Sequence, residues 1–360
     1  MAPPTIRVLL VDDSQSVRAV LRRFFARTPD LQVVGEAGDG AQAVEAVLAH
    51  EPHVVVMDLQ MPVMDGYVAI ERIMAVRPTP IVVLSSRANR NQMQTAFEAM
   101  RRGALEVLPK PEDTPSWELL ARNLPATVRA VAAARARPRP RAERAKAAAK
   151  GERPSRRRAA ALAVPLALRY VAIGASTGGP AAIREFLEEI PADSPVSFLI
   201  VQHISAGFEV GFADWLNKEF PLDVRLAQDG EKPAPGAVRL APGGAHLLLE
   251  AGGLLRLDAG TPARRGHRPS ADELFLSCAE TCPRESAGVI LTGMGSDGVE
   301  GLLALKRAGG LTMAQDEPSS VVFGMPRVAL ERGSADLALP PRELARTLVR
   351  SWQKKPEPPS

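Results

Sequence analysis

Cysteine and aromatic residues are scarce in this sequence. It contains two cysteines, Cys278 and Cys282, and only 4% of its residues are aromatic. The two cysteines are four positions apart, so on a helix they would share one face, and we expect buried, reduced thiols rather than half of a metal site. Such sparing use of cysteine is typical of a reducing cytosol, and we expect a cytoplasmic protein.

Long hydrophobic runs are also absent. No stretch approaches the ~18 uninterrupted apolar residues that a membrane span requires, and the first residues, MAPPTIRVLL, lead into a strand pattern without a basic signal region. We therefore expect no membrane insertion. The 360 residues exceed one typical domain, and a hydrophobic content of 46% allows more than one core. The 28 glycines and 32 prolines favour α/β domains with many short turns.

Residues 1–125 alternate between apolar strand patterns and helical patterns. This alternation predicts a doubly wound, mostly parallel sheet with helices on both faces. In the first helical pattern the apolar positions at helical spacing are Val17, Val20, Leu21 and Phe24. The strand patterns are IRVLLVDD (Ile6–Asp13), VVGEA, VVVMD (Val54–Asp58), IVVLSS (Ile81–Ser86) and EVLPKP (Glu106–Pro111), and helical patterns follow near Ser14, Gly40, Gly66 and Asn91.

Polar side chains follow the ends of these strands. Parallel strands end at one edge of a sheet, where sites form, and this edge would carry Asp12, Asp13, Asp58, Ser85 and Lys110. Three carboxylates would repel one another unless a divalent cation lay among them, and oxygen ligands with room for water favour Mg²⁺. Such a cation would also neutralise a phosphoryl group that reaches an aspartate, with Lys110 as a second cation and the Ser85 hydroxyl as a donor.

Several motifs in this region resemble those of response-regulator receiver domains. They are LLVDDS, MDLQMPVMDG, VLSS and PKP, spread over about 120 residues. Val107 stands where many receivers have a switch aromatic residue, so signalling through an aromatic rotamer is not expected here. The resemblance implies a flavodoxin-like fold, phosphorylation of Asp58, a metal site formed by Asp12, Asp13 and Asp58, a switch hydroxyl on Ser85 and a phosphoryl contact from Lys110.

After a last helical pattern over 117–134, the composition shifts to arginine, alanine and proline. The segment RARPRPRAERAKAAAKGERPSRRR has no aromatic residue and no apolar periodicity, so it cannot bury enough surface to offset its ordering entropy. Its basic residues account for much of the net charge of +4, and without stacking aromatics or a groove-binding module we expect no nucleic-acid partner. We place a receiver domain at 1–125, a basic linker at 126–166, a catalytic domain at 167–352 and a disordered tail at 353–360.

The segment RYVAIGASTGGP (Arg169–Pro180) predicts a second kind of site. Its apolar strand pattern ends in a glycine-rich turn with Ser176 at the apex, and Pro180 suits the first position of a following helix. Ser176 would then stand at the carboxyl end of a buried strand, beside a helix N-terminus that favours an anion. The G-x-S-x-G spacing also occurs in ordinary turns between a strand and a helix, so other residues must distinguish the two.

Two later strand patterns supply partners for this serine. VSFLIVQHI ends near His203, and SAGVILTGMGSDG (Ser286–Gly298) ends in a loop that contains Asp297. If these strands are parallel neighbours of the first, Ser176, His203 and Asp297 meet at one edge as nucleophile, base and orienting carboxylate, the set that acyl transfer requires. The glycines around Met294 free the backbone to turn, and we expect the Met294 N–H to stabilise an oxyanion.

The order serine, histidine, acid differs from the serine, acid, histidine order of the common α/β-hydrolases. A late histidine would be needed for the latter order. His246 lies in a predicted antiparallel excursion over 237–258, and His267 lies in a loop that could line a substrate groove. We therefore place neither of these two histidines in the triad.

Residues 169–335 resemble the catalytic domain of the chemotaxis protein-glutamate methylesterases. The matching motifs are IGASTGGP, QHI, GHRPSADELF, LTGMGSDG and AQDEPSSVVFGMP, in that order, and receiver, linker and esterase also follow one another as in that family. The resemblance implies a Rossmann-like fold and a Ser176–His203–Asp297 triad that needs no cofactor. It implies hydrolysis of glutamate methyl esters on methyl-accepting chemoreceptors to glutamate and methanol, often with deamidation of receptor glutamines. It also implies that the chemotaxis histidine kinase phosphorylates Asp58.

Two other classes of protein remain to be weighed. A phosphorylation-switched scaffold with an inactive second domain would not need all three triad residue types, which are present here. A transcriptional regulator would need a helix-turn-helix or another groove-binding module, whereas residues 169–352 offer a serine elbow. We therefore predict a phosphorylation-activated methylesterase.

Overall fold

The computed structural model describes residues 5–85, 90–135 and 168–353. These residues form two compact α/β units, each of which is described here by itself. The rest of the basic segment and the C-terminal tail lie outside the described residues.

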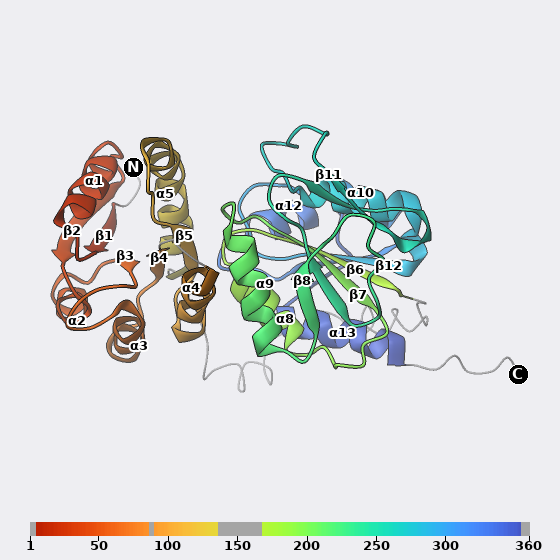
Figure 1. Ribbon diagram of the computed structural model, residues 1–360, viewed down its shortest axis with the longest axis horizontal. Helices are drawn as coiled ribbons and strands as arrows, with labels where there is room; N and C mark the ends of the chain where they lie inside the picture. Colours follow the sequence, from red (N-terminus) through yellow and green to blue (C-terminus); the bar gives the residue numbers. More distant parts are fainter. Residues whose placement is uncertain (1–4, 86–89, 136–167, 354–360) are drawn as a thin grey trace, which may run out of the picture. The chain divides into compact units, whose positions relative to one another are not determined.

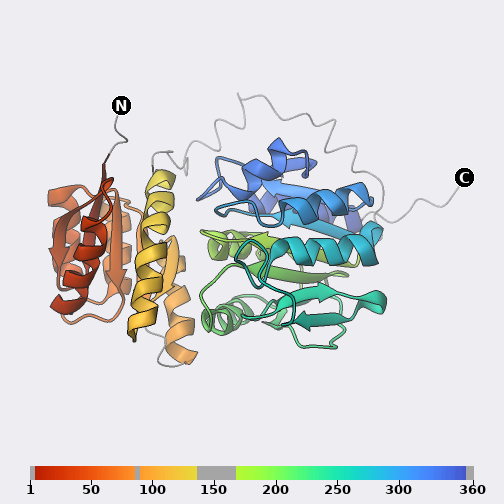
Figure 2. The same cartoon turned by 90° about the horizontal axis from the view of Figure 1, so that it is seen from above.

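The N-terminal unit contains a five-stranded sheet of order β2-β1-β3-β4-β5 in which every neighbouring pair is parallel. This is the flavodoxin-like order. Helices α1 and α5 cover one face and α2, α3 and α4 the other (Figure 1), and α1 and α5 lie in front in the view from above (Figure 2). The elements are β1 (Ile6–Val11), α1 (Gln15–Ala26), β2 (Leu31–Ala37), α2 (Gly40–His50), β3 (Val54–Asp58), α3 (Gly66–Val76), β4 (Ile81–Ser85), α4 (Arg90–Arg102), β5 (Glu106–Pro109) and α5 (Thr114–Arg135).

Local sequence explains where these elements begin. Ser14, Asp39 and Asp65 directly precede α1, α2 and α3, and the side chain of each accepts a hydrogen bond from a backbone N–H of the first helical turn. Such caps satisfy N–H groups that have no partner within the helix. Residues 8–11 of β1 and 54–57 of β3 are continuous, buried apolar runs because helices cover both faces of the sheet.

The structure adds detail to two helices that the sequence predicts in this unit. On α1 it is Phe25 that is fully buried in the core, whereas Phe24 is half-buried and packs its ring 6.0 Å from that of Trp117. Helix α5 ends at Arg135, one residue beyond the predicted helical pattern of 117–134, so the linker boundary placed at residue 126 falls inside this helix. Alanine and arginine are good helix formers, so the alanine- and arginine-rich residues at the end of α5 continue the helix.

The C-terminal unit contains a seven-stranded parallel sheet of order β14-β13-β12-β6-β7-β9-β8 and an antiparallel hairpin, β10-β11. Helices α8 and α13 pack together on one face of the sheet, and α10, α11 and α12 pack on the other (Figure 1). The strands are β6 (Tyr170–Ala175), β7 (Ser197–Gln202), β8 (Asp223–Leu226), β9 (Ala237–Leu240), β10 (His246–Leu249), β11 (Leu255–Asp258), β12 (Ser286–Ile290), β13 (Leu311–Gln315) and β14 (Leu337–Leu339). After residue 168 the chain forms the helices α8 (Gly179–Leu187), α9 (Phe208–Glu219), α10 (Ala271–Thr281), α11 (Val299–Arg307), α12 (Met325–Glu331) and α13 (Pro341–Gln353), with 3₁₀ turns η1 (Ala251–Gly253) and η2 (Pro283–Glu285).

Strand β9 corrects the predicted antiparallel excursion. Its residues AVRL pair in parallel with β7 and β8, and only the later part of the segment forms the hairpin. The sequence pattern does not reveal this buried strand because the strand contains a charged residue. Arg239 is only 1% exposed, and Asp223 and Glu231 both bind its guanidinium. Strands β8, β13 and β14 were also not predicted, and the longest of the three has five residues.

Close packing brings helix α10 against the centre of the sheet. A Cβ atom on Gly174 of β6 would lie 2.7 Å from the Cβ of Ala271, the first residue of α10. Only glycine therefore allows this approach. Cys278, on the same helix, is buried as expected, Cys282 is half-buried, and both are free thiols. Burial raises the pKa of the Cys278 thiol, so it is protonated and unreactive.

Candidate active site

The central strand β6 lies between β7 and β12, and this order brings three strand ends together. Ser176 directly follows β6, and His203 directly follows β7. The chain stays hydrogen-bonded beyond the strands: His203 N–H donates to the Ala175 carbonyl at 2.9 Å, and Ser176 N–H donates to the Thr292 carbonyl at 3.0 Å. The predicted meeting of strand ends is therefore observed.

His203 and Asp297 are directly hydrogen-bonded. The distance from His203 Nε2 to Asp297 Oδ2 is 2.8 Å, and the side chains are 10% and 1% exposed. Within the described part of the chain the other ring nitrogen, Nδ1, is buried and has no hydrogen-bond partner. A ring that donates through Nε2 to a carboxylate keeps Nδ1 as an acceptor, which is the arrangement of a general base.

The N-terminus of α10 holds the Asp297 carboxylate in place. Oδ1 accepts from the Ser270 hydroxyl at 2.6 Å and from the Asp272 N–H at 3.2 Å, and Oδ2 accepts from the Ala271 N–H at 2.7 Å. Burial alone would raise the pKa of Asp297, but the hydrogen bond and charge of His203, together with those donors, hold this pKa far below its usual range. Asp297 is therefore ionised at neutral pH.

Ser176 stands in the tight turn that its glycines predict. Gly178 has φ of 75°, in the left-handed region that favours glycine, and α8 starts at Gly179 with a proline in its first turn. The Ser176 carbonyl accepts from Gly179 N–H at 2.7 Å and from Gln202 Nε2 at 2.9 Å, and Gln202 Nε2 also donates to the His203 carbonyl at 2.8 Å. In the described residues the Ser176 hydroxyl has no hydrogen bond to His203, a contact that often forms only when substrate is bound.

Two backbone N–H groups beside Ser176 have no hydrogen-bond acceptor among the described residues: those of Met294 and Thr177. Met294 follows Gly293, where a Cβ atom would lie 2.7 Å from the Cβ of Ser176. Unpartnered donors next to a nucleophile can stabilise an oxyanion. Met294 was predicted from its glycine-rich loop. Thr177 was missed, although the residue after the serine of a G-x-S-x-G elbow commonly supplies such a donor.

The two remaining histidines of this unit have different roles. His246 is fully buried; its Nδ1 accepts from Ser270 N–H, and its Nε2 donates to the Pro262 carbonyl, both at 3.2 Å. This histidine therefore braces the backbone. His267 lies with its ring parallel to that of His203, with the centroids 3.8 Å apart. The expectation that neither belongs to the triad agrees with this geometry, but the stacking on His203 was not predicted.

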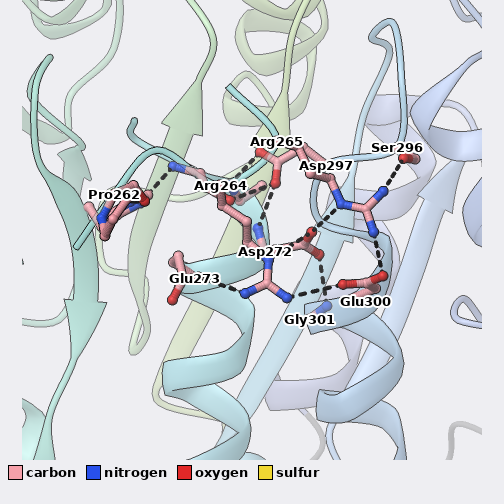
Figure 3. Close-up of polar contacts among 12 residues, drawn as sticks. Pro262, Arg264, Arg265, Asp272, Glu273, Ser296, Asp297, Glu300 and Gly301 are labelled. Atoms are coloured by element: carbon pink, nitrogen blue, oxygen red, sulfur yellow. Dashed lines mark hydrogen bonds and ion pairs between the residues drawn. The ribbon is translucent and has the colours of Figure 1, made fainter. Parts of the chain in front are cut away.

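Ion pairs anchor the loop that contains His267. Arg264 binds Glu273 of α10 at 2.8 Å and Glu300 of α11 at 3.0 Å, as Figure 3 shows. Arg265 binds the same Glu300 and donates to the Ser296 hydroxyl at 3.0 Å. Ser296 directly precedes Asp297, so these pairs connect the loop to the carboxylate that orients His203.

The N-terminal unit holds the predicted acidic cluster. Carboxylate oxygens of Asp12, Asp13 and Asp58 all lie within 4.8 Å of one another. Lys110 Nζ lies 2.8 Å from Asp12 Oδ2 and also bonds Asp58 Oδ2. Ser85 is the buried last residue of β4, and its carbonyl accepts the Lys110 N–H at 2.7 Å. The strand ends thus gather the predicted residues.

The charges of this cluster fit a hard divalent cation. Burial raises the pKa of Asp12, the nearby Asp58 raises it further, and Lys110 compensates only in part. Burial lowers the pKa of Lys110, but its bonds to Asp12 and Asp58 outweigh this and raise it. One lysine is therefore too little positive charge for three carboxylates. Because Asp13 is exposed, a cation bound here could keep water ligands, as Mg²⁺ usually does.

Fold and sites together define a two-unit protein that combines a receiver with a serine hydrolase. Residues 8–121 match the response regulator receiver domain family and residues 171–348 the CheB methylesterase family. Proteins named protein-glutamate methylesterase/protein-glutamine glutaminase are similar over nearly their full length. That of Geobacter metallireducens is 40% identical over 96% of this chain and 98% of its own, and one from Anaeromyxobacter dehalogenans is 43% identical over 95% and 96%.

Two crystal structures of the CheB protein from Thermotoga maritima are also similar to parts of the chain. Its methylesterase catalytic domain is 37% identical and covers 51% of this chain and 98% of its own, with a TM-score of 0.49. Its response regulator domain is 37% identical over 35% and 94%, with a TM-score of 0.32. The near-complete coverage of the full-length relatives decides the assignment: the chain belongs to the CheB methylesterase family.

Proposed function

We propose that this protein is a phosphorylation-regulated hydrolase that removes methyl groups from glutamate methyl esters of methyl-accepting chemotaxis receptors. The observation that carries the proposal is the bond between His203 Nε2 and Asp297 Oδ2, which leaves the buried Nδ1 without a partner beside the serine turn. A non-catalytic scaffold would have no use for a histidine oriented in this way. Membership in the CheB methylesterase family supports the same activity.

In the proposed reaction, Ser176 attacks the ester carbonyl while His203 Nδ1 takes the hydroxyl proton. Asp297 keeps the proton on Nε2 and stabilises the imidazolium. The N–H groups of Met294 and Thr177 would donate to the oxyanion. The tetrahedral intermediate then releases methanol, which takes the proton from His203. Water, activated by the same histidine, hydrolyses the acyl-enzyme to glutamate and free Ser176.

Deamidation of receptor glutamines is the second activity that we propose. Its steps are the same, except that the leaving group is ammonia. The imidazolium of His203 would protonate this poorer leaving group as the intermediate collapses. The names of the similar proteins, which include a glutaminase activity, support this part of the proposal.

The receiver would control this chemistry. We propose that Asp58 accepts a phosphoryl group from the chemotaxis histidine kinase, with Asp12, Asp13 and Asp58 holding Mg²⁺, which would neutralise the phosphoryl charge. Lys110 would contact a phosphoryl oxygen, and Ser85 would donate to another. Substrates on the cytoplasmic part of receptors imply a cytoplasmic enzyme. Within the described residues no helix is long and apolar enough to cross a membrane.

Methanol release from methylated receptor, measured with the full-length protein, tests the proposal. Wild type should release methanol, and Ser176→Ala should lose at least about 10³-fold in kcat. Circular dichroism would check that the variant is folded. Activity of Ser176→Ala close to that of wild type would exclude the proposed nucleophile, and a folded, phosphorylated wild type without activity would favour the scaffold.

A further inference from the structure

Thr292 follows β12 and lies beside the serine turn, but its side chain has no part in the proposed reaction. It is fully buried. Its hydroxyl accepts the Val322 N–H at 2.9 Å and lies 3.0 Å from the Thr177 carbonyl and 3.2 Å from the Val322 carbonyl, to which it can donate. One hydroxyl thus connects the turn after Ser176 to the 316–324 segment.

The backbone of Thr292 is held on both sides as well. Its carbonyl accepts the Ser176 N–H at 3.0 Å, and its own N–H donates to Gln315 Oε1 at 2.7 Å. Thr292 therefore contacts the serine turn twice, once through the Ser176 N–H and once through the Thr177 carbonyl. A shift of this residue would move the peptide groups on both sides of Ser176.

The next residue extends this support to the expected oxyanion donor. Gly293 N–H donates to the Val322 carbonyl at 3.1 Å, and the Gly293 carbonyl accepts the Met325 N–H at 2.8 Å. In a trans peptide the C=O and the following N–H point in opposite directions. The bond from Met325 therefore fixes the direction of the Met294 N–H. The Thr292 hydroxyl bonds Val322, the same residue whose carbonyl accepts the Gly293 N–H.

We propose that Thr292 is a positioning residue: its hydroxyl sets the placement of Ser176 and of the Met294 N–H by joining the serine turn to the 316–324 segment. This inference rests on the proposed function. Valine has almost the same shape as threonine but lacks the hydroxyl, so Thr292→Val removes the hydrogen bonds while keeping the packing. With valine the Val322 N–H would lose its acceptor and the Thr177 carbonyl a donor, and the turn would relax.

Three variants of the full-length protein test this proposal. We expect Thr292→Val to lower kcat for methanol release by about 10- to 100-fold with KM within about threefold, because a small misplacement of reacting groups has effects of this size. Thr292→Ser, which keeps the hydroxyl, should stay within about threefold of wild type. The matched control is Thr312→Val. Thr312 lies on β13 and is also fully buried, and its hydroxyl bonds the Asp336 carboxylate at 3.0 Å. This variant should lower the melting temperature and leave kcat unchanged.

The rate at which a fluorophosphonate labels Ser176 gives a second measurement that does not depend on receptor binding. Labelling should slow in Thr292→Val and recover in Thr292→Ser. If Thr292→Val does not accumulate as folded protein, Thr292→Ala is compared with Thr292→Ser in its place. Equal kcat and labelling rates in wild type and Thr292→Val, or equal losses in Thr292→Val and Thr312→Val, would overturn the positioning role. Failure of wild type itself to release methanol would instead contradict the proposed function.

Discussion

The imidazole ring of His267 lies parallel to that of His203, with ring centroids 3.8 Å apart and an interplanar angle of 4°. Burial lowers the pKa of His267, and the neighbouring His203 lowers it further. His267 is therefore neutral at neutral pH and offers a flat, uncharged surface to the ring that we propose as the base. The arginine pairs of its loop hold it there.

This stacking predicts different effects for two substitutions. His267→Phe keeps a flat ring against His203, and we expect kcat/KM to stay within about threefold of wild type at pH 8. His267→Ala leaves one face of His203 unsupported and should cost about tenfold, since catalysis depends on the orientation of the base. Steady-state methanol release measures both. Equal losses in the two variants would show that the ring nitrogens of His267, and not its flat surface, matter.

The same residue predicts a pH dependence of stability. The folded state lowers the pKa of His267, so below the unfolded value of about 6.5 the unfolded chain binds more protons at this site than the folded one. The free energy of unfolding should therefore fall as pH drops below about 6.5. Urea unfolding at pH 7, 6 and 5 should show a smaller fall for His267→Phe than for wild type. Identical slopes would contradict the lowered pKa.

The proposed triad predicts non-additive losses. Ser176→Ala and His203→Ala should lower kcat by similar factors, and the double variant should lose little more, because neither residue acts without the other. Asp297→Ala should be milder, since His203 can still accept the proton. If kcat of the double variant fell by the product of the two single-variant factors, the serine and the histidine would act independently.

Much of this site could be predicted because it lies at the ends of buried parallel strands. Such strands are continuous apolar runs, so the polar residue that ends each run stands out, as Ser176, His203 and Asp58 do. Residues whose role depends on tertiary contacts could not be found in this way. Thr292 acts through segments 115 and 30 positions away, and no local pattern brings His267 onto His203.

The prediction for strand β9 was wrong for a different reason. Arg239 interrupts its apolar pattern, and only the fold shows that Glu231 and Asp223 neutralise this charge at 2.6 Å each. Sequence alone cannot distinguish a buried, paired arginine from an exposed one. The end of α5, by contrast, was predicted to within one residue, because its alanine- and arginine-rich sequence is a helical pattern over 117–134 and the helix ends at Arg135.

This buried arginine predicts a large effect on stability. Arg239→Met leaves Glu231, which is 11% exposed, without its buried arginine partner, and should lower the free energy of unfolding by about 3–5 kcal/mol. Arg225 binds the same Glu231 at 2.8 Å but is 45% exposed. Arg225→Met should therefore cost at most about 1 kcal/mol. Urea unfolding of both variants measures the difference, and similar losses would show that the burial of Arg239 does not matter.

Asp58 offers the most direct test of control by the receiver. Its Oδ1 accepts the Leu59 N–H at 2.7 Å, and its Oδ2 is bonded to Lys110. A phosphoryl group on this carboxylate would change the hydrogen bonding of Lys110, which also contacts Asp12 at 2.8 Å. Such a local change biases a two-state equilibrium, and a tenfold rise in activity needs only about 1.4 kcal/mol of differential stability.

We therefore expect a small phosphodonor with Mg²⁺ to raise methanol release by the full-length protein, and removal of the metal with EDTA to abolish the rise. Asp58→Asn should leave basal activity within about twofold and remove the response, because an amide cannot accept the phosphoryl group. Asp65→Asn is the matched control: Asp65 caps α3 by accepting the Val68 N–H at 2.9 Å, and asparagine is an equally good cap. This variant should respond like wild type, since it leaves the acidic cluster intact. A response that persists in Asp58→Asn would place the phosphoryl group on another residue, whereas a response lost in both variants would trace the effect to the fold of the receiver and not to Asp58.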